Sequence, residues 1–226
     1  MKFIFCCLIC FCSIFSGCMS KLERLVRDNI SEYREFIVWG QSGDVSASLM
    51  CGMREVDYKI NGIATDLIEF GVLTIGAKDE SLLIAGVEYI LFVGTKKYSG
   101  ELEKNPFNGT LVADIKEVVD ENSNISLVIK FDDGDIPIKL QKVNTKWGID
   151  SEGCIDILMN KYNGELKKFV NNGVFEGEVY IKIMQDDIFA LNDFYYLVSV
   201  YGKEGKSINV ILSPISGEIL ASNVKI

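Results

Sequence analysis

In the stretch Val45-Ser46-Ala47-Ser48-Leu49-Met50-Cys51-Gly52-Met53, every second residue is apolar. This period of two is typical of a half-buried β-strand, because successive side chains of a strand point to opposite faces. The period extends from Glu35 to Val143, and no helical pattern of comparable length interrupts it. The predicted strands are Phe36 to Trp39, Val45 to Met53, Asp57 to Ile60, Leu67 to Ile75, Leu82 to Phe92, Lys96 to Leu102, Thr110 to Val118, Ile125 to Phe131 and Ile136 to Val143.

Turn signals separate these strands. They are Asn61-Gly62, Gly94-Thr95, Pro106-Phe107-Asn108-Gly109 and Asp132-Asp133-Gly134-Asp135, and the Asn-Gly and Asp-Gly pairs fit tight hairpin loops. About 110 residues with roughly seven to nine such strands match the size and rhythm of an immunoglobulin-like sandwich. We therefore predict a mainly β protein in which residues 35–145 form an immunoglobulin-like antiparallel β-sandwich. The resemblance ends at the architecture, because the Cys-Trp-Cys spacing of true immunoglobulin domains is absent.

A different pattern begins around Trp147 to Asp150, where we place a domain boundary. Apolar residues then recur at steps of three and four, which predicts a core-facing helix; they are Ile155, Leu158, Tyr162, Leu166 and Phe169/Val170. Asp150 or Ser151 is suited to cap its start, and Asn171-Asn172-Gly173 to end it. Strands follow at Gly177 to Met184, Phe194 to Tyr201, Ser207 to Leu212 and Glu218 to Ala221. Residues 146–226 are thus predicted as a small α+β domain, with one helix packed on an antiparallel meander.

The end of this domain resembles the closing hairpin of PepSY domains. The residues that carry the resemblance are Tyr196-Leu197-Val198-Ser199-Val200, the glycine-rich turn after them, Ile208 to Leu212, and Ser216-Gly217-Glu218-Ile219-Leu220. Ser213 and Ser216 depart from the pattern, since that family usually has an acidic residue and a threonine there. The resemblance implies a small extracytoplasmic module of the kind often attached to proteases or surface proteins.

The N-terminus has the pattern of a secretory signal: Lys2, an apolar run from Phe3 to Phe15, and small residues before a cysteine. Phe15-Ser16-Gly17-Cys18 resembles the lipobox of bacterial lipoproteins, although Phe15 stands where that family usually has leucine. The resemblance implies that residues 1–17 are a lipoprotein signal peptide, that Cys18 is acylated after cleavage, and that the protein is anchored on the outer face of the cell membrane.

Two other interpretations of this segment stay open. One is an uncleaved membrane anchor, although a spanning helix needs about 20 apolar residues and Phe3 to Phe15 supplies 13. The other is ordinary secretion, with a cysteine at position 18 by chance. All three interpretations place the rest of the protein outside the cytoplasm.

Residues 18–34 are predicted as the lipidated cysteine and a juxtamembrane helix, Lys21 to Tyr33. Its apolar face comprises Leu22, Leu25, Val26, Asn29/Ile30 and Tyr33. Its opposite face carries Lys21, Arg24 and Arg27, which is either the solvated side of a helix packed on the next domain or a contact with lipid headgroups. No flexible spacer separates this helix from Cys18.

The overall charge argues against nucleic acid as a partner. The protein has 23 Lys and Arg against 32 Asp and Glu, a net charge of -9, and loss of Lys2 with the signal peptide makes it -10. A surface this acidic repels phosphate backbones and anionic lipid headgroups. Attachment to a membrane is therefore expected to depend on the lipid, and two or three acyl groups make such an anchor durable.

Only two cysteines remain for the folded body. Cys6, Cys7, Cys10 and Cys12 leave with the signal peptide and Cys18 is expected to be acylated, which leaves Cys51 and Cys154 in different predicted domains. They either form a disulfide in the oxidising compartment or remain as buried free thiols.

The sequence has no histidine, which excludes Ser-His-Asp and Cys-His catalysis and His-ligated metals. We found no hydrolase elbow or phosphate-binding loop, and predict no cofactor. Asp132-Asp133-Gly134-Asp135 and the set Asp186, Asp187 and Asp193 are either cation sites or charged loops. Arg54-Glu55 with Asp57 and Tyr58 fits a cleft, but neighbouring strand residues point to opposite faces. Further candidates are aromatic residues that offer either a stacking platform or cross-strand packing: Tyr180, Phe194, Tyr195, Tyr196 and Tyr201.

These observations favour a non-enzymatic binding or interaction module with an unidentified ligand. The expected partner is an extracytoplasmic protein or peptide, engaged through the α+β domain or an exposed strand edge. One alternative is a PepSY-like regulator or inhibitor of a surface protease. Another is a carboxylate-dependent cell-wall enzyme, which requires two Asp or Glu side chains roughly 5 to 9.5 Å apart in one cleft.

Overall fold

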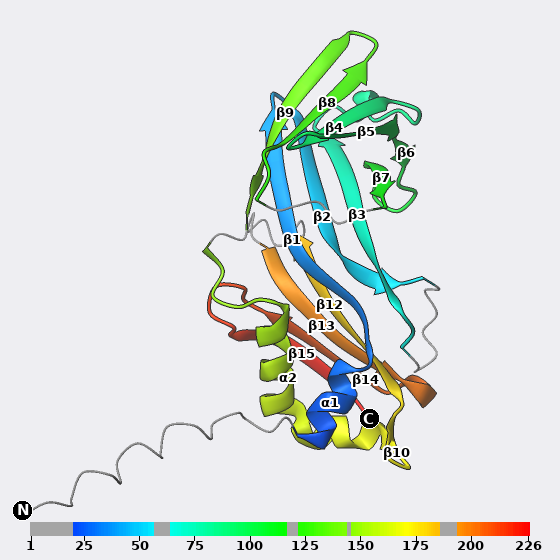
Figure 1. Cartoon of the computed structure of the whole chain (residues 1–226), viewed down its shortest axis with the longest axis vertical. Helices are drawn as coiled ribbons and strands as arrows, with labels where there is room; N and C mark the ends of the chain where they lie inside the picture. Colours follow the sequence, from blue (N-terminus) through cyan, green and yellow to red (C-terminus); the bar gives the residue numbers. More distant parts are fainter. Residues whose placement is uncertain (1–19, 57–63, 117–121, 144–145, 186–193) are drawn as a thin grey trace, which may run out of the picture.

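Figure 1 shows the computed structural model, which describes residues 20–56, 64–116, 122–143, 146–185 and 194–226. The protein folds into an upper half made of strands and a lower half in which helices cover one face of a sheet. One long path of hydrogen-bonded strands runs through both halves. The predicted mainly β fold class is therefore confirmed.

The N-terminal helix is shorter than predicted. Helix α1 covers Lys21–Arg27, and strand β1 begins at Ile30 and continues to Ser42. The prediction of a helix up to Tyr33 was wrong because Ile30 and Tyr33 pair in parallel with Val179 and Ile181 of a strand far along the sequence. That long-range pairing overrides a local helical spacing.

The upper half is a ring of antiparallel strands. After β1 come β2 (Val45–Glu55), β3 (Leu67–Ala77), β4 (Glu88–Val93), β5 (Lys96–Glu101), β6 (Glu103–Lys104), β7 (Leu111–Ile115), β8 (Ile125–Phe131) and β9 (Gly134–Lys142). One layer has the order β1-β2-β3-β7-β6, and the other β5-β4-β8-β9. At one margin β9 pairs with both β8 and β1. At the other margin the consecutive strands β5 and β6 pair with β4 and β7, so the backbone passes from one layer to the other there.

The upper core lies between these two layers. Alternate residues of β2, from Val45 to Cys51, are buried in it, as the sequence period predicts. The other layer contributes Leu91, Leu127 and Ile129, each fully buried. The finer prediction of an immunoglobulin-like sandwich is not confirmed, because β9 pairs with β1 and so links the two layers at one margin.

The predicted strands differ in accuracy. Ile125 to Phe131 has the predicted bounds, whereas the predicted strand Leu82 to Phe92 was wrong in its first half. There, Glu80–Leu82 forms a short 3₁₀ helix (η1), because the Asp79 side chain accepts a hydrogen bond from the Ser81 N–H at 2.9 Å. Gly86 then has φ of 87°, which a regular strand does not allow. The predicted strand Asp57 to Ile60 and the end of Thr110 to Val118 lie outside the described residues.

The lower half follows the predicted order of one helix and an antiparallel meander. Its elements are α2 (Ser151–Leu166), η3 (Lys167–Phe169), the short hairpin β10 (Val170–Asn171) and β11 (Val174–Phe175), β12 (Gly177–Gln185), β13 (Phe194–Gly202), η4 (Lys203–Gly205), β14 (Ser207–Leu212) and β15 (Ile219–Lys225). Asp150 caps α2 as predicted, since its side chain accepts a hydrogen bond from the Gly153 N–H at 2.9 Å.

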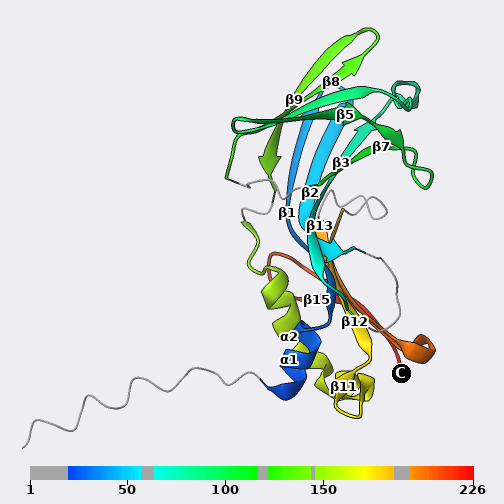
Figure 2. The same ribbon diagram turned by 45° about the vertical axis from the view of Figure 1, so that its right-hand side comes forward.

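A second core lies between the helices and the meander, as Figure 2 shows from the side. It contains Val26 of α1, Leu158 of α2, and alternate residues of the central strands such as Val179 and Val198, all essentially inaccessible to water. Ile37 of β1 also belongs to this core, so β1 contributes to both halves. Residues 144 and 145, at the predicted domain boundary, lie outside the described residues.

Candidate functional site

The residue expected to carry the lipid, Cys18, lies outside the described residues, and the structure begins two residues later. Ser20 caps α1 by accepting a hydrogen bond from the Glu23 N–H at 3.1 Å. Glu23 adds a negative charge in the first turn, where the helix dipole favours it. Regular structure thus starts immediately after the expected attachment point.

Helix α1 packs against the lower half. Val26 is fully buried, and Leu22 and Leu25 are partly buried against the lower core. These three residues belong to the apolar face that the sequence predicts. Lys21 and Arg24, predicted on the opposite face, are exposed.

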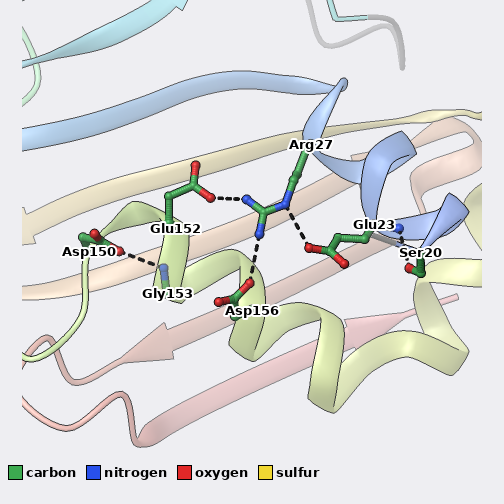
Figure 3. A network of polar contacts seen from close by, with 7 residues as sticks. All are labelled: Ser20, Glu23, Arg27, Asp150, Glu152, Gly153 and Asp156. Carbon is green, nitrogen blue, oxygen red and sulfur yellow. Dashed lines mark hydrogen bonds and ion pairs between the residues drawn. The ribbon is translucent and has the colours of Figure 1, made fainter. Parts of the chain in front are cut away.

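Arg27 does not belong to that solvated face, and its predicted place was wrong. Its side chain is only 18% exposed and reaches from α1 to α2, as Figure 3 shows. Nη2 lies 2.9 Å from Asp156 Oδ1, Nη1 forms an ion pair with Glu152, and Nε lies 3.2 Å from Glu23 Oε1. A planar guanidinium satisfies several carboxylates at once. Arg27 therefore fixes the expected juxtamembrane helix to the body of the protein.

The carboxylates of Glu23 and Glu152 favour the charged form of the Arg27 guanidinium. Burial acts to lower the pKa of its guanidinium, but hydrogen bonds with Glu23 and Glu152 outweigh this effect and raise the pKa. The charge is therefore permanent at any physiological pH. Glu152 and Asp156 are largely exposed, so each pair alone contributes at most about 1 kcal/mol. Their shared partner makes the three carboxylates act as one network.

A second group of charges lies where β1 meets β12. Glu32 is only 4% exposed and accepts a hydrogen bond from Arg34 Nε at 3.0 Å. Lys182 Nζ of β12 lies 3.2 Å from its other carboxylate oxygen. Arg34 also donates to the Ile183 carbonyl at 2.8 Å. These contacts join the first strand of the upper half to the first long strand of the meander.

The group of charged and polar side chains continues along β12. The Tyr180 hydroxyl donates to Glu178 Oε2 at 2.5 Å, and both residues are buried. Lys182 Nζ lies 5.2 Å from the centre of the Tyr180 ring, within range of a cation–π interaction. We call Glu32, Arg34, Glu178, Tyr180 and Lys182 the junction cluster. Two acidic and two basic side chains balance one another there, which suits a structural role, because buried charges are tolerated when they are paired.

Arg54 and Glu55 act separately, as expected for neighbours on a strand. Arg54 lies 3.6 Å from Asp114 and stacks 4.7 Å from the centre of the Phe70 ring. Glu55 is buried and accepts a hydrogen bond from the Thr65 N–H. Asp57 and Tyr58, the other members of this predicted cleft, lie outside the described residues.

The aromatic residues of β12 and β13 pack within the protein. Tyr180 and Tyr196 are each 1% exposed, and the Tyr180 and Tyr201 rings lie 5.8 Å apart across neighbouring strands. Trp147 contacts Tyr196 edge to face at 5.4 Å and Phe194 at 6.2 Å. Tyr195, like Phe194, is partly buried. Cross-strand packing is confirmed, and the alternative of a stacking platform was wrong for the buried rings.

The acidic turn Asp132-Asp133-Gly134-Asp135 joins β8 to β9, and its carboxylates are exposed. With Ile84 and other residues it lines an open groove of about 670 Å³. Among the residues that the structure describes, no group of three or more His, Cys, Asp or Glu is arranged to hold a metal ion. Asp186, Asp187 and Asp193 lie outside those residues.

Cys51 and Cys154 are free thiols, each fully buried, one in the upper core and one in the lower core. The prediction of buried thiols is confirmed, and the alternative of a disulfide between them was wrong. Burial raises the pKa of the Cys154 thiol, with a further contribution from the nearby charge of Asp150. Both thiols are therefore unreactive in the folded protein.

No protein family matches the sequence, and neither does any curated protein or solved structure. A search of the described residues for membrane-spanning helices finds none that is long and apolar enough to cross a bilayer.

Proposed function

We propose that this protein is a bacterial surface lipoprotein, anchored through an acylated Cys18 on the outer face of the cell membrane, that acts by binding and not by catalysis. The sequence of residues 1–18 supports the anchor. The observation that carries the proposal is the Arg27 network, because it holds the helix next to Cys18 rigidly against the body. A lipid at Cys18 then positions the whole protein close to the bilayer.

The proposed binding surface is the outer edge of β15. This strand is the last in the sheet order and pairs with β14, and all of its residues after Ile219 are exposed. Leu220 and Val224 are 57% and 40% exposed. An exposed edge offers backbone donors and acceptors to an extended peptide, and side-chain pockets provide selectivity. The proposed partner is therefore an extracytoplasmic protein or peptide that adds a strand beside β15.

The immunoglobulin-like sandwich remains a proposal for residues 35–145, as a rigid domain that stands between the anchor and the cell surroundings. Its support is the apolar core enclosed by two layers of short antiparallel strands.

Metabolic labelling tests the anchor. Cells that express the full-length protein are grown with a radiolabelled fatty acid, and the wild type is compared with Cys18→Ser. We expect label on the wild type only, and release of the variant into the medium. Cys154→Ser serves as the matched control and retains the label. Unlabelled wild-type protein, or a mature protein that still begins at Met1, contradicts the anchor.

A photo-reactive amino acid at Asn223 of β15 tests the binding surface on intact cells. The matched control position is Lys139, an exposed residue of β9 in the upper half. We expect a discrete cross-linked product at position 223 and none at position 139. No product at 223, or equal products at both positions, contradicts binding at this edge.

A second candidate function is regulation of a surface protease by the lower half. Helix α2 over the antiparallel strands β12 to β15 is the arrangement that the PepSY resemblance implies. The test adds the mature protein, in increasing amounts, to a protease from the surface of the same cells. A saturable change in cleavage rate supports regulation, and an unchanged rate at saturating concentration contradicts it.

A further inference from the structure

Lysines gather at the end of the lower half where α1 begins. Lys168, Lys203 and Lys206 line a single hollow of about 360 Å³ between η3, the β10–β11 hairpin and η4. Lys21 Nζ lies 3.8 Å from the position that a Cβ on Gly173 would occupy, so α1 adds its charge at the hairpin turn. Lys225 Nζ lies 3.5 Å from the corresponding position on Gly205. We call these residues, together with the exposed Lys167, the lysine face.

The β10–β11 hairpin presents an apolar residue within this face. Its turn is formed by Asn172 and Gly173, both with positive φ, at 50° and 81°. Val174 follows directly and is 61% exposed. An apolar residue at a hairpin tip, surrounded by cationic side chains, fits the interface between charged headgroups and acyl groups.

The side chains that line the hollow carry three positive and two negative charges, whereas the whole protein has a net charge of -9. The hollow also contains Glu176 and Glu204. Glu176 is already paired, because Lys203 Nζ lies 3.1 Å from its carboxylate. The hydrogen bond from Lys203 lowers the pKa of Glu176, and Lys206 adds to the effect. The remaining positive charge is available to an external anion.

The lysine face adjoins the expected lipid. One residue separates Cys18 from Ser20 in the sequence, so a lipid on Cys18 is joined to the start of α1 by a very short stretch of backbone. Lys21 follows Ser20 directly, and its Nζ lies near the hairpin turn. Figure 1 places α1, the β10 hairpin and the C-terminus together at the lower end of the molecule. Acyl groups on Cys18 therefore bring the lysine face to the bilayer surface.

We infer that the lysine face is a docking surface for anionic phospholipid headgroups of the membrane in which the Cys18 lipid is inserted. This inference rests on the proposed anchor. Phosphate groups pair with the lysines, and Val174 enters the interface. Each lysine near an anionic surface strengthens binding by about fivefold. Docking directs the long axis away from the membrane and presents the upper half to the surroundings.

The test attaches the protein to vesicles chemically, so that it does not depend on acylation in the cell. Both cores consist of residues 26–212, so a protein of residues 18–226 retains them. Cys18 is then the accessible thiol, because Cys51 and Cys154 are buried. It is coupled to a maleimide lipid in vesicles of phosphatidylglycerol or of phosphatidylcholine. Amide hydrogen exchange is measured at the β10–β11 hairpin and η4.

On phosphatidylglycerol we expect exchange at these segments to slow by at least about fivefold relative to phosphatidylcholine. The triple variant K168Q/K203Q/K206Q loses this protection. The matched variant K97Q/K104Q/K139Q, which removes the same charge from exposed positions of the upper half, keeps it. High salt abolishes the protection in the wild type, which tests the inference without any substitution.

Equal exchange on the two lipids, or equal effects of the two triple variants, overturns the inference. Loss of the protection in millimolar inorganic phosphate also overturns it, because it indicates a site for a small anion. A failed fatty-acid label on Cys18 contradicts the anchor itself. Because the vesicle experiment couples Cys18 chemically, it still tests the lysine face in that case. Failure of the anchor and failure of the docking surface are therefore distinguishable.

Discussion

The two halves of this protein bury different kinds of side chains. The upper core is lined by apolar residues from two layers of strands. The lower half has an apolar core under its helices, but its sheet also carries four of the five buried polar residues among those described, namely Ser31, Glu32, Glu178 and Ser199, whereas the upper half has Glu55 at the end of β2. Two groups of charged pairs fix elements of the lower half: the Arg27 network joins α1 to α2, and the Glu32–Lys182 pair of the junction cluster joins β1 to β12.

This difference distinguishes an upper half that depends on apolar packing from a lower half that also depends on charged side chains. Apolar packing depends little on pH or salt, whereas buried ion pairs depend on their partners being present and ionised. The expected anchor, the exposed β15 edge and the lysine face all belong to the lower half. We therefore expect the upper half to tolerate changes of surface charge, and the lower half to be sensitive to them.

The largest expected effect comes from truncating each core. Leu127→Ala in the upper half and Leu158→Ala in the lower half each remove a buried leucine and lower the free energy of unfolding by about 3 kcal/mol. Because β1 contributes to both cores, we expect both halves to unfold together in either variant.

Two tryptophans report on this cooperativity, Trp39 on β1 in the upper half and Trp147 against Tyr196 in the lower core. Their fluorescence is followed during urea unfolding in single-tryptophan versions of each variant. Coincident midpoints support the shared strand. Separate midpoints for the two tryptophans show independent halves.

Loss of one member of the junction cluster has the next largest effect. Glu32→Ala removes the buried carboxylate that Arg34 and Lys182 share, and we expect a loss of about 2 kcal/mol of unfolding free energy. The effect is moderated because Arg34 and Lys182 are each about one fifth exposed. Urea denaturation measures it, with the exposed Glu218→Ala as control. A change as small as that of the control contradicts the structural role of the cluster.

Arg27→Ala loosens α1 and has a smaller effect, about 1 kcal/mol on global stability, because its partners on α2 are exposed. Hydrogen exchange of the α1 amides should accelerate more than that of the upper half. Arg24→Ala, which removes the same charge from an exposed position of the same helix, leaves exchange unchanged. If hydrogen exchange of the α1 amides is the same in the two variants, the claim that Arg27 fixes the helix is contradicted.

The smallest effect concerns pH. The pKa of Glu176 is lowered by the hydrogen bond from Lys203 in the folded protein, so this pair stabilises the fold above the unfolded pKa of the carboxyl. The contribution is lost as pH falls through the lowered value. Thermal unfolding should therefore separate wild type from Glu176→Gln slightly at pH 7 and not at about pH 2. A difference that grows at low pH reverses the expected sign.

Local patterns predicted much of this structure. The strand Ile125–Phe131 and the strand Ser207–Leu212 were predicted with their observed bounds, because alternating apolar residues and adjacent turns define both. The cap at Asp150 could likewise be predicted from the residues next to it. Contacts between distant residues could not be predicted in this way. Arg27 pairs with Glu152 and Asp156, and Tyr33 with Ile181, and no local spacing distinguishes these partners from other charged or apolar residues.

The parallel pairing of β1 with β12 also sets the order in which the two halves can form during synthesis. Every strand of the upper ring comes from Ile30–Lys142, so the ring has all its parts before α2 has been synthesised. Ile30, at the start of β1, can pair only after Val179, about 150 residues later, has been synthesised. Such distant pairings form slowly. All strands of the upper half are therefore present early, whereas the edge of β1 that faces β12, at the end nearest the expected anchor, gains its partner only after β12 has been made.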